Sequence, residues 1–413
     1  MKPGGIINYA RKFDYRLWIL ALGWVASAVG FSLSIPFISI YFHSELGISL
    51  TGIGLFFGLA ALVRAGFQGV GGELSDRFGR YHLMVTAQII RSFIFLMMAL
   101  SVYRGWGFYP VGGLLILNSI FGAFFQPAAN ATVADLVDRD KRTEAYAITR
   151  VAGNFGWALG PAAGGFLAAN SYHLLFIFSG AMTMVSSIII AVFLRGLKPV
   201  GVAAGQRSRL RDILSYRGHE LIIRHAALLF LLYLVMSQLI APFSLYAVDF
   251  AGITEEQLGF LFTLNGLLVA FLQIPTTRLL SRFRLTVQLS LGAVIYAVAF
   301  FWIGATGTFF LFVIGIILVT TGENFVSPPA LSITANLAPP GRTGRYMGIY
   351  GFSVTFGWSL GPLLGGLLME WAKPDFIYSW GVIAAIALAA AVGFGCLTKQ
   401  IPDDLNRYRE INK

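Results

Sequence analysis

Charged residues and cysteine are both scarce in this chain of 413 residues, and each scarcity excludes a class of protein. Asp, Glu, Lys and Arg together make up 12% of the sequence, about half of the ~25% that is usual in soluble domains. The single cysteine, Cys396, excludes an internal disulfide and a cysteine-based zinc cluster. The five histidines are scattered and form no cluster with carboxylates, so we expect no metal site, no cofactor and no enzyme active site.

Hydrophobic residues, by contrast, make up 57% of the sequence, and the mean hydropathy is +0.73. Long apolar runs recur with short polar breaks, whereas a membrane β-barrel would show short segments of alternating polarity. The first run is too long for the apolar core of a signal peptide. Each run exceeds the ~20 residues that a helix needs to cross a bilayer, so we predict an all-α integral membrane protein. Its twelve expected spans are 17–42, 50–74, 81–103, 109–134, 143–168, 174–196, 223–248, 254–278, 284–305, 308–335, 344–369 and 376–398.

A polar, basic segment divides the twelve spans into two sets of six. We therefore expect an N-terminal half (1–196), a cytoplasmic linker (197–222) and a C-terminal half (223–413) that ends in a short cytoplasmic tail. All but four of the 30 Lys and Arg residues lie at the termini, in the even-numbered loops or at the adjoining span ends. The four exceptions are Arg64, Arg91, Arg104 and Lys373.

Positive charge collects on the cytoplasmic side of membrane proteins, so this distribution predicts that both termini are cytoplasmic. The net charge of +11 is then a topology signal that faces anionic lipid. It does not indicate nucleic-acid binding.

Two stretches 201 residues apart carry nearly the same glycine pattern. They read NFGWALGPAAGG at 154–165, in span five, and TFGWSLGPLLGG at 355–366, in span eleven. Other residues recur at matching places in the two halves, among them Pro127 with Pro328. Two six-span halves with the same orientation indicate parallel repeats, related by a pseudo-two-fold axis along the membrane normal.

The glycines of these stretches lie three or four residues apart, so they form a smooth ridge on one face of a helix. Small residues let helix backbones approach closely inside a membrane, and a proline removes a backbone hydrogen bond and bends the helix. A kinked, glycine-faced helix suits an interface that rocks; static helix packing is the alternative. The expected packing residues are Gly156, Gly160, Pro161, Gly164, Gly361 and Pro362.

The loop between spans two and three reads GGELSDRFGR at 71–80 and resembles the signature loop of the major facilitator superfamily. The stretch GWALGPAAGG in span five resembles the motif typical of the drug–proton antiporter branch of its twelve-span members. The resemblance covers essentially the whole chain and implies the major-facilitator fold, with twelve transmembrane helices in two six-helix halves. Two residues depart from the family pattern: Asn118 replaces the usual arginine of span four, and Tyr81 replaces a basic residue of the loop.

The resemblance also implies a charge network that holds the cytoplasmic side shut and breaks when that side opens. Solvated charges that only set the topology are the alternative. The residues implied in this cytoplasmic gate are Asp76, Arg77, Gly79, Arg80, Asp135 and Arg142.

Three charged residues lie near the middle of spans, where each costs about 2.5–3.5 kcal/mol on insertion scales. Glu323 is the only carboxylate near a span centre. Burial favours the neutral form of a carboxyl group, so Glu323 is the first candidate for proton coupling, with a structural role as the alternative. Arg64 and Arg91 lie at similar depths in spans two and three. We expect Arg64 to face the transport pathway and Arg91 to be buried and hydrogen bonded to carbonyls or amides.

Polar side chains at comparable depth are expected to line a substrate cavity together with Arg64. They are Asn118, Gln126, Asn154, Gln238, Asn265 and Asn324.

The leading hypothesis is a monomeric, proton-coupled exporter of amphipathic organic compounds that works by alternating access in the prokaryotic cytoplasmic membrane. The proton gradient would supply the energy. The alternatives are a proton-coupled symporter, a transporter of lipids or anionic amphiphiles, and, in a different class, a membrane sensor or scaffold that transports nothing.

Overall fold

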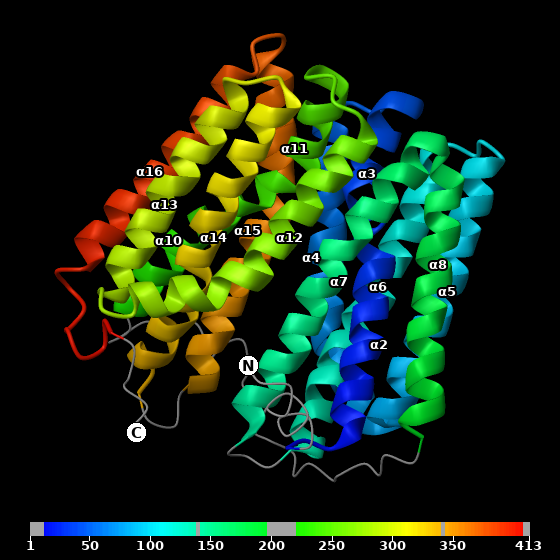
Figure 1. The fold of residues 1–413 in the computed structure, drawn as a ribbon, viewed down its shortest axis with the longest axis horizontal. Helices are drawn as coiled ribbons and strands as arrows, with labels where there is room; N and C mark the ends of the chain where they lie inside the picture. The colour runs from blue at the N-terminus through cyan, green and yellow to red at the C-terminus, as the bar shows by residue number, and fades with distance from the viewer. Residues whose placement is uncertain (1–11, 138–140, 196–219, 340–342, 408–413) are drawn as a thin grey trace, which may run out of the picture. The chain divides into compact units, whose positions relative to one another are not determined.

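The computed structural model describes residues 12–137, 141–195, 220–339 and 343–407, and for a few helical residues in these ranges only the backbone. The regular structure of these residues is entirely helical (Figure 1). The first half contains α2 (Tyr15–Ser32), α3 (Ile35–Ile40), η1 (Tyr41–Glu45), α4 (Leu50–Phe78), α5 (Arg80–Tyr103), α6 (Phe108–Leu136), α7 (Arg142–Asn170) and α8 (Tyr172–Phe193). The second half contains α10 (Glu220–Met236), η3 (Ser237–Leu239), α11 (Ala241–Leu245), η4 (Tyr246–Phe250), α12 (Glu255–Leu280), α13 (Leu285–Gly304), α14 (Phe309–Leu337), α15 (Thr343–Ala372) and α16 (Ile377–Leu397). Most of the expected linker, up to residue 219, lies outside the described residues.

Eleven helical segments within the described ranges are long and apolar enough to cross a membrane. The remaining expected span is α7, which has 29 residues but is less apolar because glycines and charged residues interrupt it. The prediction of an all-helical, multi-pass membrane protein is therefore confirmed.

Spans one and seven are interrupted at matching places. In span one, α2 ends at Ser32 and α3 begins at Ile35. In span seven, α10 ends at Met236 and α11 begins at Ala241, with a short 3-10 turn between them. A proline occupies the first turn of each second piece, where its missing N–H would have had no helical partner. The sequence therefore builds the same interruption into both halves.

The helices group by packing into two compact units. The division follows the two sequence halves, except that the beginning of α4 belongs to unit 2 and the beginning of α12 to unit 1. Unit 1 comprises Met1–Phe42, Leu62–Ala203 and Thr254–Gly266; unit 2 comprises His43–Ala61, Ala204–Ile253 and Leu267–Lys413.

The two units are built from corresponding helix pairs. In unit 1 the main pairs are α2 with α7, α2 with α8, α5 with α6 and α5 with α8. In unit 2 they are α10 with α15, α10 with α16, α13 with α14 and α13 with α16. Since α10 to α16 follow the same order as α2 to α8, the repeated sequence folds as a repeated structure.

The residues after α16 fold back onto unit 2. Asn406 is fully buried, and its side-chain oxygen accepts a hydrogen bond from the backbone N–H of Thr286, 3.0 Å away in the first turn of α13. Its amide donates to the Thr286 hydroxyl at 2.8 Å. Asn336 on α14 donates to the carbonyl oxygens of Leu405 and Arg407, at 3.0 and 3.1 Å. This C-terminal segment therefore joins α13 to α14 and caps α13.

Candidate functional site

Glu323 lies near the middle of α14, and its side chain is half-buried. Tyr296, on the neighbouring helix α13, is buried and lies within electrostatic range of Glu323 and Tyr233. Gly322 lets the two helices come together here, because a Cβ atom at that position would stand 3.2 Å from the Tyr296 ring. The acid therefore shares its surroundings with phenol groups.

A fourth residue extends this group. The hydroxyls of Tyr233 on α10 and Tyr350 on α15 are 2.8 Å apart and share a hydrogen bond. Their rings meet edge to face, with centroids 6.2 Å apart. We name Glu323, Tyr296, Tyr233 and Tyr350 the Glu323 cluster; it joins four spans of unit 2. Phenol hydroxyls both donate and accept hydrogen bonds, so the cluster brings donors and acceptors together in one part of unit 2.

The three tyrosines of this cluster were not predicted from the sequence. The sequence does contain a signal that could have identified them, because each tyrosine lies inside a predicted span, as the intramembrane polar residues do. The side chain of the predicted residue Asn324, next to Glu323, is buried, and its oxygen has no hydrogen-bond partner among the described residues. Its backbone carbonyl accepts from Gln273 on α12 at 3.4 Å.

Arg91 lies in the middle of α5 and is 4% exposed. Its Nη1 donates to Gln88 Oε1 at 2.8 Å and to Ser27 Oγ at 3.4 Å, and its Nε donates to Asn118 Oδ1 at 3.4 Å. A Cβ atom at Gly122 on α6 would stand 3.6 Å from the guanidinium carbon. Arg91 therefore has the neutral, amide-rich environment that the sequence analysis expected, and Asn118 is buried as one of its partners.

Arg64 on α4 has a different environment. Its side chain is exposed, and its guanidinium carbon lies 5.7 Å from the centroid of the Phe31 ring on α2. Arg91 lies 5.9 Å from the same centroid. Trp157 on α7 meets Phe31 edge to face at 5.8 Å. The structure thus brings together two intramembrane arginines and two aromatic rings in unit 1.

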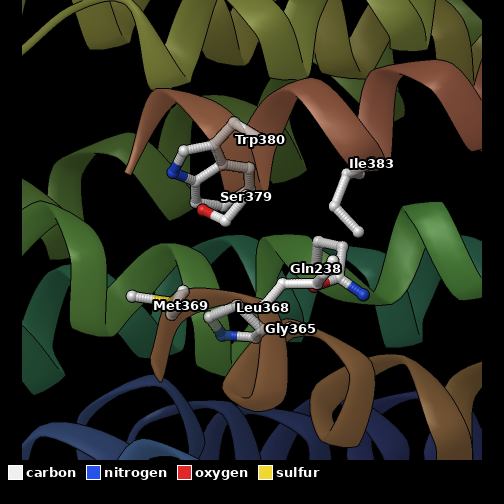
Figure 2. A pocket seen from close by; sticks show the side chains of 8 residues that line it. Gln238, Gly365, Leu368, Met369, Ser379, Trp380 and Ile383 are labelled. Carbon is white, nitrogen blue, oxygen red and sulfur yellow. The ribbon is translucent and has the colours of Figure 1, made fainter. Parts of the chain in front are cut away.

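Gln238 is fully buried in span seven. Its amide donates to the carbonyl oxygens of Leu234 and Gly361, at 2.9 and 2.8 Å. It borders a small pocket. The other lining residues are Pro242, Gly365, Leu368, Met369, Ser379, Trp380 and Ile383. Figure 2 shows the pocket and labels all of its lining residues except Pro242.

Two polar atoms of this pocket have no hydrogen-bond partner among the described residues, Gln238 Oε1 and Trp380 Nε1. Buried polar groups of this kind are commonly satisfied by an ordered water. The contacts of Gln238 are those of a residue that ties the interrupted span seven to α15. Its predicted place in a substrate cavity stays a prediction.

The remaining cavity candidates are spread over three helices. Gln126 on α6 is exposed, whereas Asn154 on α7 and Asn265 on α12 are half-buried. Their role in binding stays a prediction.

At the signature loop, Arg80 forms an ion pair with Asp135 and also donates to the carbonyl oxygen of Ala131 at 2.7 Å. These contacts join the beginning of α5 to the end of α6. Gly79 has φ = +86°, a conformation that favours glycine, and it places Arg80 at the first position of α5. Arg77 is exposed. The side chains of Asp76 and Arg142 lie outside the described residues, so the gate network as a whole stays a prediction.

The glycine ridge of α7 packs on span one. A Cβ atom at Gly156 would stand 2.7 Å from the carbonyl oxygen of Val25, and one at Gly160 would stand 2.8 Å from the N atom of Leu33. Gly164 likewise faces Phe37, at 2.8 Å. In unit 2, a Cβ atom at Gly361 would stand 2.8 Å from the carbonyl oxygen of Leu234. Glycine is required at these places because the backbones leave no room for a side chain.

The proline side of each motif meets a second helix. In unit 1, a Cβ atom at Gly266 on α12 would stand 2.7 Å from the Cα atom of Ala158. In unit 2, a Cβ atom at Gly54 on α4 would stand 2.8 Å from the Cα atom of Leu363, next to Pro362. Each motif helix is therefore in backbone contact on two faces, which accounts for its many glycines.

The family model described as Major Facilitator Superfamily matches residues 20–254 and 226–410. The chain is 27% identical to the "Uncharacterized MFS-type transporter YttB" of Bacillus subtilis (strain 168), covering 86% of this chain and 88% of the relative. It is 26% identical to the "Multidrug resistance protein MdtH" of Proteus mirabilis (strain HI4320), covering 86% of this chain and 87% of the relative.

Solved structures share the fold at low sequence identity. A crystal structure of the peptide transporter POT in complex with sulfate aligns with a TM-score of 0.77 at 15% identity, over 95% of each chain. A bacterial homologue of the human lysosomal transporter Spinster, in an inward-facing and occupied conformation, aligns with a TM-score of 0.73 at 14% identity, over 96% of this chain and 98% of that one. The family model spans nearly the whole chain and the relatives are transporters, so this chain is a transporter, not an enzyme, and it belongs to the major facilitator superfamily.

Proposed function

We propose that this chain is a proton-coupled secondary transporter that exports amphipathic organic compounds by alternating access. It acts as a monomer in the prokaryotic cytoplasmic membrane, with both termini in the cytoplasm and no cofactor. Its relatives named as multidrug resistance proteins support export. The antiporter-type glycine motif of span five, which is packed on two faces, supports movement about that helix.

One observation carries the proton coupling: Glu323 places a carboxyl group in the middle of a spanning helix, within electrostatic range of the buried Tyr296. An ionised carboxylate is costly to bury there, whereas the protonated acid is far less costly. Tyrosine hydroxyls can donate to the carboxylate and accept from the acid. Gain and loss of one proton therefore change the charge of unit 2 at the depth where a substrate would pass.

The test is transport into proteoliposomes with an imposed pH gradient. Glu323→Gln mimics the protonated acid but cannot release a proton, so we expect it to abolish pH-driven transport while substrate binding or slow exchange remains. Glu370→Gln is the matched control, because that glutamate lies near the end of α15 with an exposed side chain. Full pH-driven transport by Glu323→Gln would assign the coupling to another acid, with Asp135 and Asp76 the next to be tested.

A second function, transport of an anionic amphiphile, is favoured by the exposed Arg64 in the middle of α4. Transport of an anionic amphiphile is compatible with proton coupling through Glu323.

A further inference from the structure

Two guanidinium groups lie against one aromatic ring inside unit 1. The guanidinium carbons of Arg64 and Arg91 are 5.7 and 5.9 Å from the centroid of the Phe31 ring. The two cations are close enough to repel one another. Placing two like charges together in the middle of spanning helices is unfavourable, so a compensating interaction is to be expected.

The protein itself compensates only one of them. Arg91 donates to Gln88, Ser27 and Asn118, and these partners are all neutral. Within the described residues, Arg64 has no hydrogen bond, and no carboxylate of unit 1 lies at ion-pair distance from either arginine. Two ion pairs of unit 1, Lys12 with Glu144 and Arg80 with Asp135, involve other residues. The positive charge of this site is therefore left unneutralised by these parts of the chain.

Arg64 lies on a different face of α4 from an exposed stripe of leucines. This stripe consists of Leu55, Leu59 and Leu62, all of them exposed. At ~3.6 residues per turn, Arg64 is about 160° away from Leu62 around the helix. Its side chain points instead to Phe31 on α2 and still remains exposed. A guanidinium whose N–H donors have no hydrogen-bond partner in the described part of the chain, and which has one accessible side, is suited to bind a carboxylate or phosphate with two parallel hydrogen bonds.

An apolar surface lies directly beside this cation. Phe31 and Trp157 are both half-buried and meet edge to face at 5.8 Å. Asn118 adds a second unused donor, because its Nδ2 atom is buried with no partner among the described residues. Cation, amide and aromatic wall are thus contributed by four different spans of the same unit.

We propose that Arg64 binds the acidic group of the transported compound, and that this compound is an amphiphile with a carboxylate or phosphate whose apolar part packs on Phe31 and Trp157. Arg91 is a positioning residue: held by its three partners, it fixes Phe31 and adds positive potential. The inference rests on the proposed function, since it names the chemistry of the exported compound.

The test measures binding rather than transport. Purified protein in nanodiscs of a zwitterionic lipid is titrated by calorimetry with four decyl-chain probes: decanoate, decyl phosphate, decylammonium and decanol. We expect the two anions to bind at least about tenfold more tightly than decylammonium, because placing like charges together is unfavourable. Arg64→Gln should reduce anion binding to the level of decanol. Arg64→Lys should lie between, because lysine keeps the charge but loses the two-fold hydrogen bonding.

Arg104→Gln is the matched control, because Arg104 is an exposed cation just after α5 and away from this site; it should bind as the wild type does. The source of the anion is tested by exchanging part of the lipid for phosphatidylglycerol. If the anionic lipid displaces decanoate from the wild type, the natural ligand is a lipid headgroup; if it does not, the ligand is a free amphiphile. In both cases the anion binds at Arg64.

Tighter binding of decylammonium than of decanoate, or unchanged decanoate affinity in folded Arg64→Gln, would overturn the inference. If Arg64→Gln does not fold, the inference is tested by two other results: the preference of the wild type for anions over decylammonium, and the affinity of Arg64→Lys for the anions. Charge-selective binding without pH-driven transport would refute the proposed function alone, and pH-driven transport without anion binding would refute this inference alone.

Discussion

Tyr233 and Tyr350 share a hydrogen bond between their hydroxyl groups, 2.8 Å long, that joins span seven to span eleven within the Glu323 cluster. Replacing either residue by Phe removes one hydroxyl and leaves the other without this partner, at a cost of about 1–3 kcal/mol when the group is buried. We expect each single variant to slow pH-driven transport about tenfold, with substrate affinity little changed. Initial rates in proteoliposomes measure the effect.

The double variant Tyr233→Phe with Tyr350→Phe is the control for this pair. Two residues that act as one unit are not additive, so the double variant should be no slower than the slower single variant. Additive losses would show that the two hydroxyls act independently.

Arg91 should matter for folding and Arg64 should not. Arg91→Ala leaves the acceptors of Gln88, Ser27 and Asn118 without their donor and opens a cavity among buried side chains. Each lost partner of a buried group costs about 1–3 kcal/mol. We expect a lower folded yield and a lower melting temperature for Arg91→Ala, but near-wild-type values for Arg64→Ala, in size-exclusion and thermal-unfolding measurements in detergent. Equal losses for the two variants would show that Arg64 has a structural role of its own.

The glycine ridge predicts opposite effects for two chemically identical substitutions. Gly156→Ala would bring a methyl group to 2.7 Å from the carbonyl oxygen of Val25, and overpacking of this kind costs about 1–3 kcal/mol. A Cβ atom at Gly113 on α6 would have nothing within 4 Å, so Gly113→Ala should be neutral or stabilising through its higher helix propensity. The sign of the change in melting temperature tests the packing: destabilisation by Gly113→Ala as large as that by Gly156→Ala would contradict it.

The C-terminal segment should contribute to the stability of unit 2. Asn406→Ala removes the side chain that caps α13 and bonds to Thr286, and the loss of such a cap costs about 0.5–2 kcal/mol. Asp404→Ala, two residues away and exposed, is the matched control. We expect a lower melting temperature for the first variant only. A melting temperature unchanged by Asn406→Ala would show that the segment is not coupled to the fold.

Hydropathy and charge were sufficient to predict the helical spans and the repeat, because each span must bury its own backbone hydrogen bonds in lipid. They were also sufficient to single out Glu323, Arg64 and Arg91, since an intramembrane charge is rare and costly. The partners of these residues could not be predicted in the same way. Whether Tyr296 faces Glu323 depends on the rotation of two helices about their axes, and the hydropathy of α13 is nearly the same on all sides.

The interruptions of spans one and seven could not be predicted from the sequence either. Both spans read as continuous apolar helices, and the prolines that follow the breaks are common in membrane helices. At each break a serine contacts another helix, which the sequence of the span alone does not reveal. Ser32 donates to the carbonyl oxygen of Gly156 at 3.2 Å, and Ser237 donates to that of Gly357 at 3.4 Å. The glycine pattern of α7 and α15 predicted close approach but not the partner.

The repeated helix pairs have a consequence for the history of the chain. Arg91 and Tyr296 each lie eleven residues after the first residue of their helix, α5 beginning at Arg80 and α13 at Leu285. Gly122 and Glu323 each lie fourteen residues after the first residue of theirs, α6 beginning at Phe108 and α14 at Phe309. The same two positions thus hold Arg91 and Gly122 in the first half. In the second half they hold Tyr296 and Glu323. If the halves arose by duplication of one six-helix gene, this pair of positions is where the two copies diverged to opposite charge.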